Sequence, residues 1–218
     1  MINTNIQAVM IDLDGTMVDT MGDFEAALNL CLADIDLPKV SPAVVNIAVG
    51  KGSEHLIRTV LRHQLDLPEV KASGMVCDNT GVENLYEPAF TRYQHHYEKV
   101  NGKFADVYPG VLAGLQQLQA RGLKMACLTN KPTAFAKALL ADKGLAGFFS
   151  HVYGGDAFPR QKPDPHQHKG NSKFESLRRT DDSLRDRSNL CAIHEEIAVT
   201  LDIIIEYRGS TGAKRGSK

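Results

Sequence analysis

The chain has 218 residues, of which 43% are hydrophobic and 23% charged, with a formal net charge of -1. This composition predicts a soluble globular protein of one large domain, or one domain that carries a smaller one, and argues against disorder. The near-zero charge excludes binding to nucleic acid or an anionic membrane through bulk charge. No apolar run is long enough for a membrane span, and no signal peptide is evident. The four cysteines are scattered without a CxxC pair, so we expect a cytoplasmic protein without disulfides or a zinc site.

The first predicted element is a buried strand over residues 6–13, whose apolar run ends in acidic residues, Gly and Thr. From about residue 20 to residue 100 the apolar spacing becomes helical, with breaks at Gly and Pro and one helix predicted over residues 54–63. This block of helices interrupts an alternation of strands and helices that resumes after it.

The alternation continues with a helix over residues 111–121, a strand over 124–129, a helix over 134–143 and a short strand over 149–153. Strands separated by helices predict the α/β class, with a doubly wound, Rossmann-like parallel sheet. We therefore expect a core made of residues 1–19 and 101–165, with an inserted helical domain at 20–100.

Residues 166–218 have a different character. The part from 166 to 189 is polar and is expected to be a poorly ordered loop, and apolar density returns only between 190 and 207. Either residues 197–207 dock beside the first strand, or that strand keeps an exposed edge. We expect this C-terminal segment to be atypical for the fold and partly disordered.

The string DLDGTMVDT, residues 12–20, carries the clearest chemistry. In open α/β sheets, ligands bind beyond the carboxyl ends of the strands. Asp12 could attack phosphorus and form an aspartyl-phosphate, while Asp14 protonates the leaving oxygen and then deprotonates water. An acidic turn without function is the alternative for two carboxylates at this spacing.

This string resembles the first motif of the haloacid dehalogenase-like hydrolases. LTNKP at 128–132 resembles their second motif, in which Thr129 would bind phosphate, and QKPDP at 161–165 resembles the third, in which Lys162 would bind phosphate and nucleophile together. The resemblance implies a phosphatase with Asp12, Asp14, Thr129 and Lys162 as catalytic residues. Gly15, Thr16 and Asn130 would contribute to substrate binding.

The same resemblance implies Mg²⁺, bound through Asp12 and the backbone carbonyl of Asp14, and makes the helical block a cap that selects the substrate. Gly50, Lys51 and Gly52 precede a predicted helix, and they could bind a substrate carboxylate. A loop with a solvated lysine is the equally weighted alternative.

Within the family, LTNKP and VYGGDAFPRQKPDP look most like the bacterial phosphoglycolate phosphatases, over about residues 5–165. The implied partner is a small phosphorylated metabolite, 2-phosphoglycolate. A sugar-phosphate phosphatase, a phosphomutase, or a truncated, non-catalytic phosphate binder remain open.

The family's fourth motif, an acidic pair after a strand, is not recognisable. An acidic cluster of Asp181, Asp182 and Asp186 lies at roughly its place, but no apolar strand leads into it. We expect this cluster to lie away from Asp12 and Asp14. The oligomeric state cannot be inferred from the sequence.

Overall fold

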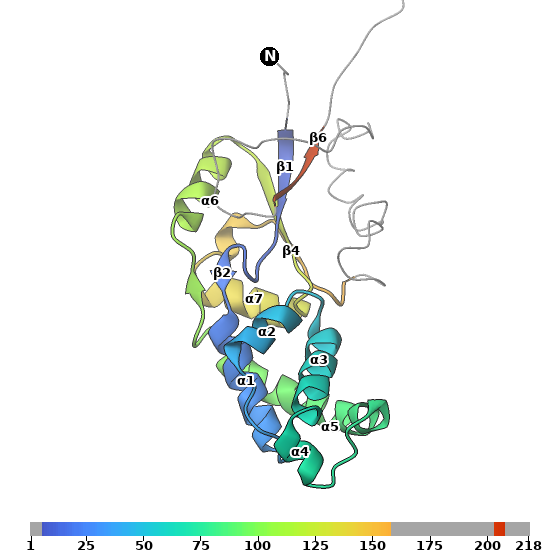
Figure 1. Ribbon diagram of the computed structural model, residues 1–218. Helices are drawn as coiled ribbons and strands as arrows, with labels where there is room; N and C mark the ends of the chain where they lie inside the picture. Colours follow the sequence, from blue (N-terminus) through green and yellow to red (C-terminus); the bar gives the residue numbers. More distant parts are fainter. Residues whose placement is uncertain (1–5, 158–202, 208–218) are drawn as a thin grey trace, which may run out of the picture.

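The computed structural model describes residues 6–157 and 203–207, and Figure 1 shows their arrangement. Within them, the main sheet has the order β5-β4-β1-β6, where β1 is Ile6–Ile11, β4 is Lys124–Leu128, β5 is His151–Tyr153 and β6 is Ile203–Tyr207. β1 and β4 run parallel with Ala8 opposite Lys124, and β5 continues the parallel pairing beside β4. The predicted α/β class with a parallel sheet is confirmed.

Described residues of β1 and β4 are buried on both faces of the sheet. Val9 and Ile11 of β1 belong to a hydrophobic cluster that includes Val111 and Leu139 of the helices α6 (Val111–Ala120) and α7 (Thr133–Asp142). Met10, which lies between them, belongs to a second cluster on the opposite face. Burial on both faces explains why the strand sequence is a continuous apolar run. Among the described helices, α6 and α7 both contribute to the cluster of the first face.

Three of the predicted strands are shorter than expected. β4 ends at Leu128 instead of residue 129, and the other two differences have local reasons. β1 ends at Ile11 instead of residue 13, because the Leu13 carbonyl accepts N–H groups of the following turn. β5 begins at His151 instead of residue 149, because a 3₁₀ turn, η1 (Ala146–Phe148), precedes it.

β6 lies on the outer side of β1 and runs antiparallel to it, with Val9 opposite Ile205. Of the two alternatives for the β1 edge, docking of the C-terminal strand is therefore the one observed, and the sheet is mixed rather than wholly parallel. The predicted loop at 166–189, the acidic cluster and Lys162 lie outside the described residues.

Five helices form the block between the first two strands of the main sheet. They are α1 (Met21–Ala33), α2 (Pro42–Ala48), α3 (Ser53–Leu65), α4 (Pro68–Ala72) and α5 (Asn79–Val100). Figure 1 shows them together beyond the carboxyl end of β1. They enclose a hydrophobic cluster of their own, separate from that of the sheet, which includes Leu28, Ile57 and Tyr97. We call this helical block, residues 21–100, the cap, and the division of the chain into core and cap stays a proposal.

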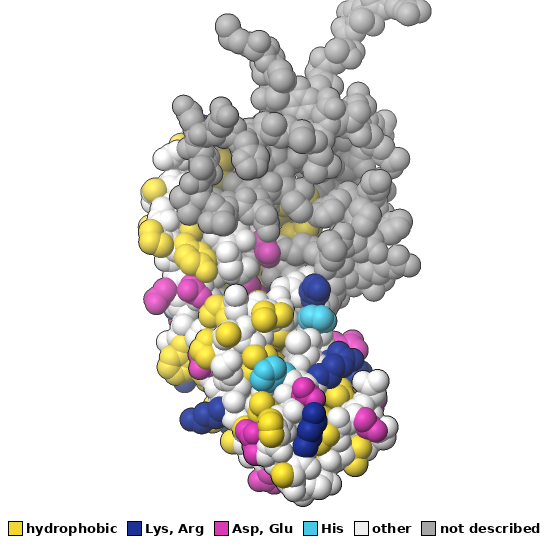
Figure 2. All heavy atoms as spheres, viewed as in Figure 1, with side chains coloured by type: hydrophobic (Ala, Val, Ile, Leu, Met, Phe, Trp, Pro, Cys, Tyr) yellow, Lys and Arg dark blue, Asp and Glu magenta, His cyan; other side chains and the backbone are white. Residues whose placement is uncertain are grey.

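The surface of these helices in Figure 2 has hydrophobic, basic and acidic side chains next to one another. In the described part of the chain, no helix is both long and apolar enough to span a membrane.

The chain crosses between sheet and helical block twice, and the two crossings are joined. β2 (Val18–Asp19) pairs antiparallel with β3 (Asp106–Val107). Beside this pair, the wholly buried carboxylate of Asp23 accepts hydrogen bonds from the backbone N–H groups of Gly102 (2.6 Å) and Phe104 (2.8 Å). The start of α1 and the return segment after α5 are thus connected through one side chain.

Candidate active site

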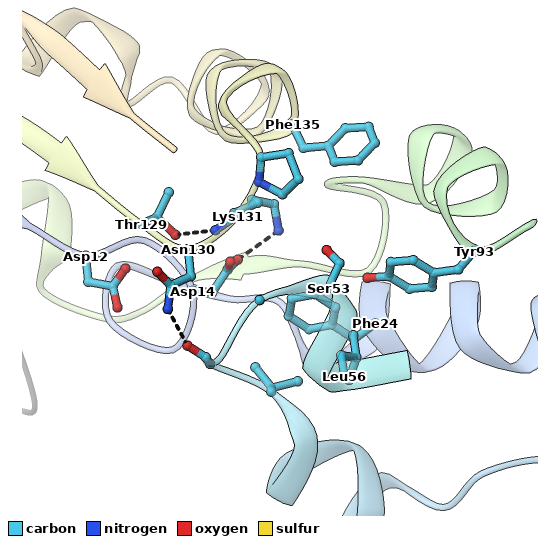
Figure 3. Close-up of a pocket in the computed structure, with 14 residues that line it drawn as sticks. Asp12, Asp14, Phe24, Ser53, Leu56, Tyr93, Thr129, Asn130, Lys131 and Phe135 are labelled. Carbon is cyan, nitrogen blue, oxygen red and sulfur yellow. Dashed lines mark hydrogen bonds and ion pairs between the residues drawn. The ribbon is translucent and has the colours of Figure 1, made fainter. Parts of the chain in front are cut away.

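A pocket lies where the carboxyl ends of β1 and β4 face the helical block (Figure 3). Asp12 follows β1 and Thr129 follows β4, and these strands are parallel neighbours, so the sheet itself brings the two residues to one edge. The cap contributes mainly apolar residues to the lining. The pocket lining comprises Asp12, Asp14, Thr129, Asn130, Lys131 and Pro132 from the core, Phe135 from α7, and Phe24, Val49, Gly50, Gly52, Ser53, Leu56 and Tyr93 from the cap.

The turn after β1 is tightly hydrogen-bonded. The Asp12 carboxylate accepts the N–H of Leu13 at 2.8 Å, and the Leu13 carbonyl accepts N–H groups from further along the turn. Gly15 has φ = 73°, a left-handed conformation that side chains disfavour, and its N–H donates to Val18. Thr16 is buried, but neither it nor Gly15 is among the residues that line the pocket. Their predicted contact with substrate stays a prediction.

The Asp14 carboxylate is fixed by two side chains. Its Oδ1 accepts the Thr20 hydroxyl at 2.9 Å and lies 2.9 Å from Lys131 Nζ. Only 2% of the Lys131 side chain is exposed, against 13% of Asp14. The Lys131 ammonium also donates to the Tyr97 hydroxyl at 2.5 Å and lies 4.9 Å from the centre of the Phe24 ring. A buried ammonium needs such partners, because desolvation disfavours its charge.

Lys131 is the residue of this pocket that sequence reasoning missed. It lies inside the LTNKP string, where only Thr129 and Asn130 had been assigned roles. Its partners explain the omission, because Tyr97 in α5 and Phe24 in α1 are both distant from Lys131 in the sequence. The signal available was a lysine directly after a strand end, at the edge where the two carboxylates were already expected.

The loop after β4 is shaped by its neighbours. Thr129 is buried, its N–H donates to the Tyr153 carbonyl, and its Oγ accepts the Lys131 N–H at 3.2 Å. The Asn130 side-chain amide donates to the Gly50 carbonyl at 2.8 Å, so this loop is bonded directly to the cap. Thr129, Asn130 and Asp12 thus line the same pocket, and the roles predicted for Thr129 and Asn130 stay predictions.

The loop after β5 supports the loop after β4. The Gly155 N–H donates to the Lys131 carbonyl at 2.9 Å, and a Cβ at Gly154 would lie only 2.3 Å from the Thr133 nitrogen. Asp156 accepts both the N–H and the hydroxyl of Thr133, the first residue of α7. Although partial burial opposes it, these hydrogen bonds lower the pKa of Asp156 below its usual range.

The cap residues predicted from the sequence divide into two groups. Gly50 and Gly52 line the pocket, and both have positive φ, of 103° and 85°. Lys51 is exposed and is not among the lining residues, so its role stays a prediction. Gly52 is followed by α3, which has no side-chain cap at its N-terminus.

Two tyrosines of α5 are buried beside the core residues. Burial, followed by the negative charge of Asp14, raises the pKa of both Tyr93 and Tyr97 well above the usual value. Both phenols are therefore protonated at neutral pH and can act as hydrogen-bond donors.

The donor set at the strand ends has the chemistry of a Mg²⁺ site. Asp12 offers a carboxylate and Asp14 a backbone carbonyl, and Mg²⁺ commonly takes one or two protein carboxylates, with waters and phosphate oxygens as its other ligands. Among the described residues there is no cluster of three or more His, Cys, Asp or Glu side chains that would make a metal site without substrate. The carboxylate of Asp12 and the backbone carbonyl of Asp14 are oxygen donors of the kind that Mg²⁺ takes.

Comparison with known proteins places these features in context. A model of the haloacid dehalogenase-like hydrolases matches residues 6–168. A phosphoglycolate phosphatase of Cupriavidus necator is 38% identical over 72% of this chain and 62% of its own length, and one of Thiobacillus denitrificans is 35% identical over 73% and 65%. This chain thus spans less than two thirds of the length of these curated relatives. The crystal structure of a predicted phosphoglycolate phosphatase from Haemophilus somnus has a TM-score of 0.68 and 24% identity, covering 82% of this chain and 73% of the other. That last similarity supports the fold alone.

Proposed function

The chain belongs to the haloacid dehalogenase-like hydrolases, and from this membership we propose that it is a phosphatase acting on a small phosphomonoester. The observation that carries the proposal is the meeting of Asp12, Asp14 and Thr129 in one pocket at the carboxyl ends of β1 and β4. Two carboxylates and a hydroxyl at that edge supply a nucleophile, an acid/base and a phosphate ligand.

In the proposed reaction, an Asp12 oxygen attacks phosphorus, and the bond between phosphorus and the ester oxygen breaks. Asp14 gives a proton to that oxygen, so the product leaves as an alcohol. Asp14 then takes a proton from water, which attacks phosphorus of the aspartyl-phosphate and restores the Asp12 carboxylate with release of phosphate. Thr129 donates a hydrogen bond to a phosphoryl oxygen. The bonds from Thr20 and Lys131 keep Asp14 in place for both transfers.

A phosphate dianion and the Asp12 carboxylate repel each other, by about 4 kcal/mol per charge pair at 4 Å and intermediate dielectric. Cations must offset this repulsion. The family resemblance supplies Lys162, which lies outside the described residues, and Mg²⁺ bound by Asp12 and the Asp14 carbonyl. When bound, Mg²⁺ would neutralise charge on the phosphoryl oxygens.

For the substrate we propose 2-phosphoglycolate, because the curated relatives at 35–38% identity are phosphoglycolate phosphatases. The products would be glycolate and phosphate. The mainly apolar cap wall and the polar core floor suit a small substrate with its charge at the strand ends. The cytoplasmic location expected from the sequence stays a prediction.

A panel of phosphate esters, assayed for phosphate release with and without Mg²⁺, tests this proposal. We expect Mg²⁺-dependent release, fastest with 2-phosphoglycolate. Preference for glucose phosphates would favour the sugar-phosphate or phosphomutase branch. Binding of 2-phosphoglycolate without turnover of any ester would instead favour a non-catalytic phosphate binder.

A further inference from the structure

We propose that Lys131, the Tyr93 hydroxyl and the N-terminus of α3 form a subsite that binds a carboxylate on the leaving group of the substrate. The inference rests on the proposed phosphatase function, which it extends by naming the groups that distinguish an anionic leaving group from a neutral one. It replaces the exposed Lys51 by the buried Lys131 as the cation of the subsite.

The position of Lys131 relative to Asp14 places it on the leaving-group side. Asp14 is the group that protonates the ester oxygen, and Lys131 Nζ lies 2.9 Å from Asp14 Oδ1. In 2-phosphoglycolate the carboxylate is separated from that ester oxygen by a single methylene group. A cation bonded to the acid/base is therefore within reach of a carboxylate attached so near to the oxygen that leaves.

Lys131 has a donor left for this contact. An ammonium group has three N–H donors, and Lys131 uses two of them within the described part of the chain, toward Asp14 and the Tyr97 hydroxyl. Its charge is nearly unscreened by solvent, because 2% of the side chain is exposed. A hydrogen bond between charged groups in such surroundings is stronger than one in water.

The N-terminus of α3 faces the same pocket. In this 13-residue helix the first intrahelical bond runs from the Leu56 N–H to the Gly52 carbonyl, and no side chain caps the end. The N–H groups of Ser53, Glu54 and His55 consequently have no acceptor inside the helix. Gly52 and Ser53 line the pocket, so these donors and the positive end of the helix dipole favour an anion there.

Tyr93 is the independent observation that points to a ligand. Its side chain lines the pocket, and the residue is only 2% exposed. Its hydroxyl makes no hydrogen bond with another residue that the structure describes. In Figure 3 the hydroxyl points toward Ser53 and the interior of the pocket. The hydroxyl is not among the fully buried side-chain atoms that lack a partner, so it is open to the pocket, where a bound carboxylate oxygen would accept its hydrogen bond.

The test compares the affinities of 2-phosphoglycolate and ethyl phosphate, in which a methyl group replaces the carboxylate. The two dissociation constants are measured by calorimetric titration in Mg²⁺ buffer. The titration uses the Asp12→Asn chain, which cannot form the acyl-phosphate and therefore does not hydrolyse either phosphate ester. We expect tighter binding of 2-phosphoglycolate. Adding Lys131→Met should reduce the ratio of the two affinities roughly 10- to 100-fold. Adding Tyr93→Phe should reduce it roughly 3- to 10-fold.

Two further lysine variants complete the design. Lys137→Met changes an exposed lysine of α7 outside the pocket and should leave the ratio unchanged. Lys51→Met tests the rival cation. If Lys131→Met lowers the affinity for both ligands by the same factor, Lys131 only positions Asp14 and the subsite is refuted. A ratio that falls with Lys51→Met but not with Lys131→Met refutes it as well.

These measurements separate the subsite from the proposed function. Lack of turnover in the unmodified chain, together with a ratio that depends on Lys131, would refute the phosphatase and support the subsite. Turnover together with an affinity ratio that is independent of Lys131 and Tyr93 would support the phosphatase and refute the subsite. If Lys131→Met does not fold, as judged by its thermal melting curve, the Tyr93→Phe variant decides alone. Equal affinity for both ligands in the Asp12→Asn chain without a further substitution also refutes the subsite.

Discussion

Replacement of Asp23 by Asn should destabilise the protein through the junction between cap and core. The carboxylate is wholly buried, and its two oxygens accept the N–H groups of Gly102 and Phe104 at 2.6 and 2.8 Å. In Asn, an NH₂ group replaces one of these oxygens and faces an N–H donor. One backbone donor then loses its partner in a buried place.

The magnitude follows from the hydrogen bonds lost. A hydrogen bond to a charged group contributes about 1.5–3 kcal/mol, and a buried donor without a partner costs about 1–3 kcal/mol. We therefore expect Asp23→Asn to lower the free energy of unfolding by about 2–3 kcal/mol. Asp23→Ala, which removes both acceptors, should lower it by about 3–5 kcal/mol, because the two losses share one site and do not simply add.

Urea denaturation followed by circular dichroism measures these changes, with the slope of the transition checked for two-state behaviour. Glu25→Gln is the matched control. It makes the same acid-to-amide change two residues further along α1, at a partly exposed side chain that has no hydrogen-bond partner among the described residues. It should change stability by no more than about 0.5 kcal/mol. Equal stabilities of Asp23→Asn and Glu25→Gln would show that the junction does not depend on Asp23.

Three further predictions concern the loop after β5 and the buried thiol of the helical block. Gly154→Ala should displace the loop after β4 and lower the free energy of unfolding by about 1–3 kcal/mol, because its Cβ would lie 2.3 Å from the Thr133 nitrogen. Gly147→Ala, with open space around its Cβ, should leave the free energy of unfolding nearly unchanged. Urea or thermal unfolding measures both, and similar effects of the two variants would contradict the packing argument. The pKa of Asp156 is lowered in the folded state, so the stability it contributes is complete above its unfolded pKa of about 3.9 and disappears as pH falls through the lower folded value. The stability difference between the unmodified chain and Asp156→Asn should accordingly shrink below about pH 4, and a difference that is constant with pH would refute it. Burial raises the pKa of Cys31 to about 11, so at pH 8 a thiol reagent followed by peptide mass spectrometry should label the half-buried Cys77 much faster; comparable rates would count against the buried thiol.

The sequence was sufficient for the part of the site that lies along single segments. Asp12 and Asp14 follow an apolar run, and Thr129 follows another, so the rule for strand ends was enough to bring them together. The exposed edge of the first strand made docking of residues 197–207 one of two alternatives, but it did not give the antiparallel direction in which β6 runs.

The sequence did not predict contacts that depend on how the cap meets the core. Lys131 pairs with Asp14 and Tyr97 because α5 returns beside the strand ends. These residues are far apart in the sequence, so no local sequence pattern predicts that they meet. Lys51 had been considered as a cation for the substrate carboxylate, with equal weight given to a solvated loop lysine, and its side chain is exposed. Asp23 looked like an ordinary acidic residue in the first turn of a helix, and its burial follows only from the return of the chain at Gly102 and Phe104.

The central claim is that Asp12 is a nucleophile that carries the phosphoryl group. Mixing the protein with 2-phosphoglycolate and Mg²⁺, stopping the reaction in acid within its first turnover and analysing peptides by mass spectrometry tests this directly. The account predicts that the peptide containing Asp12 gains the mass of one phosphoryl group, and that Asp12→Asn shows neither this gain nor phosphate release. Phosphate release that persists in Asp12→Asn, or a phosphoryl group found on another residue, would contradict it.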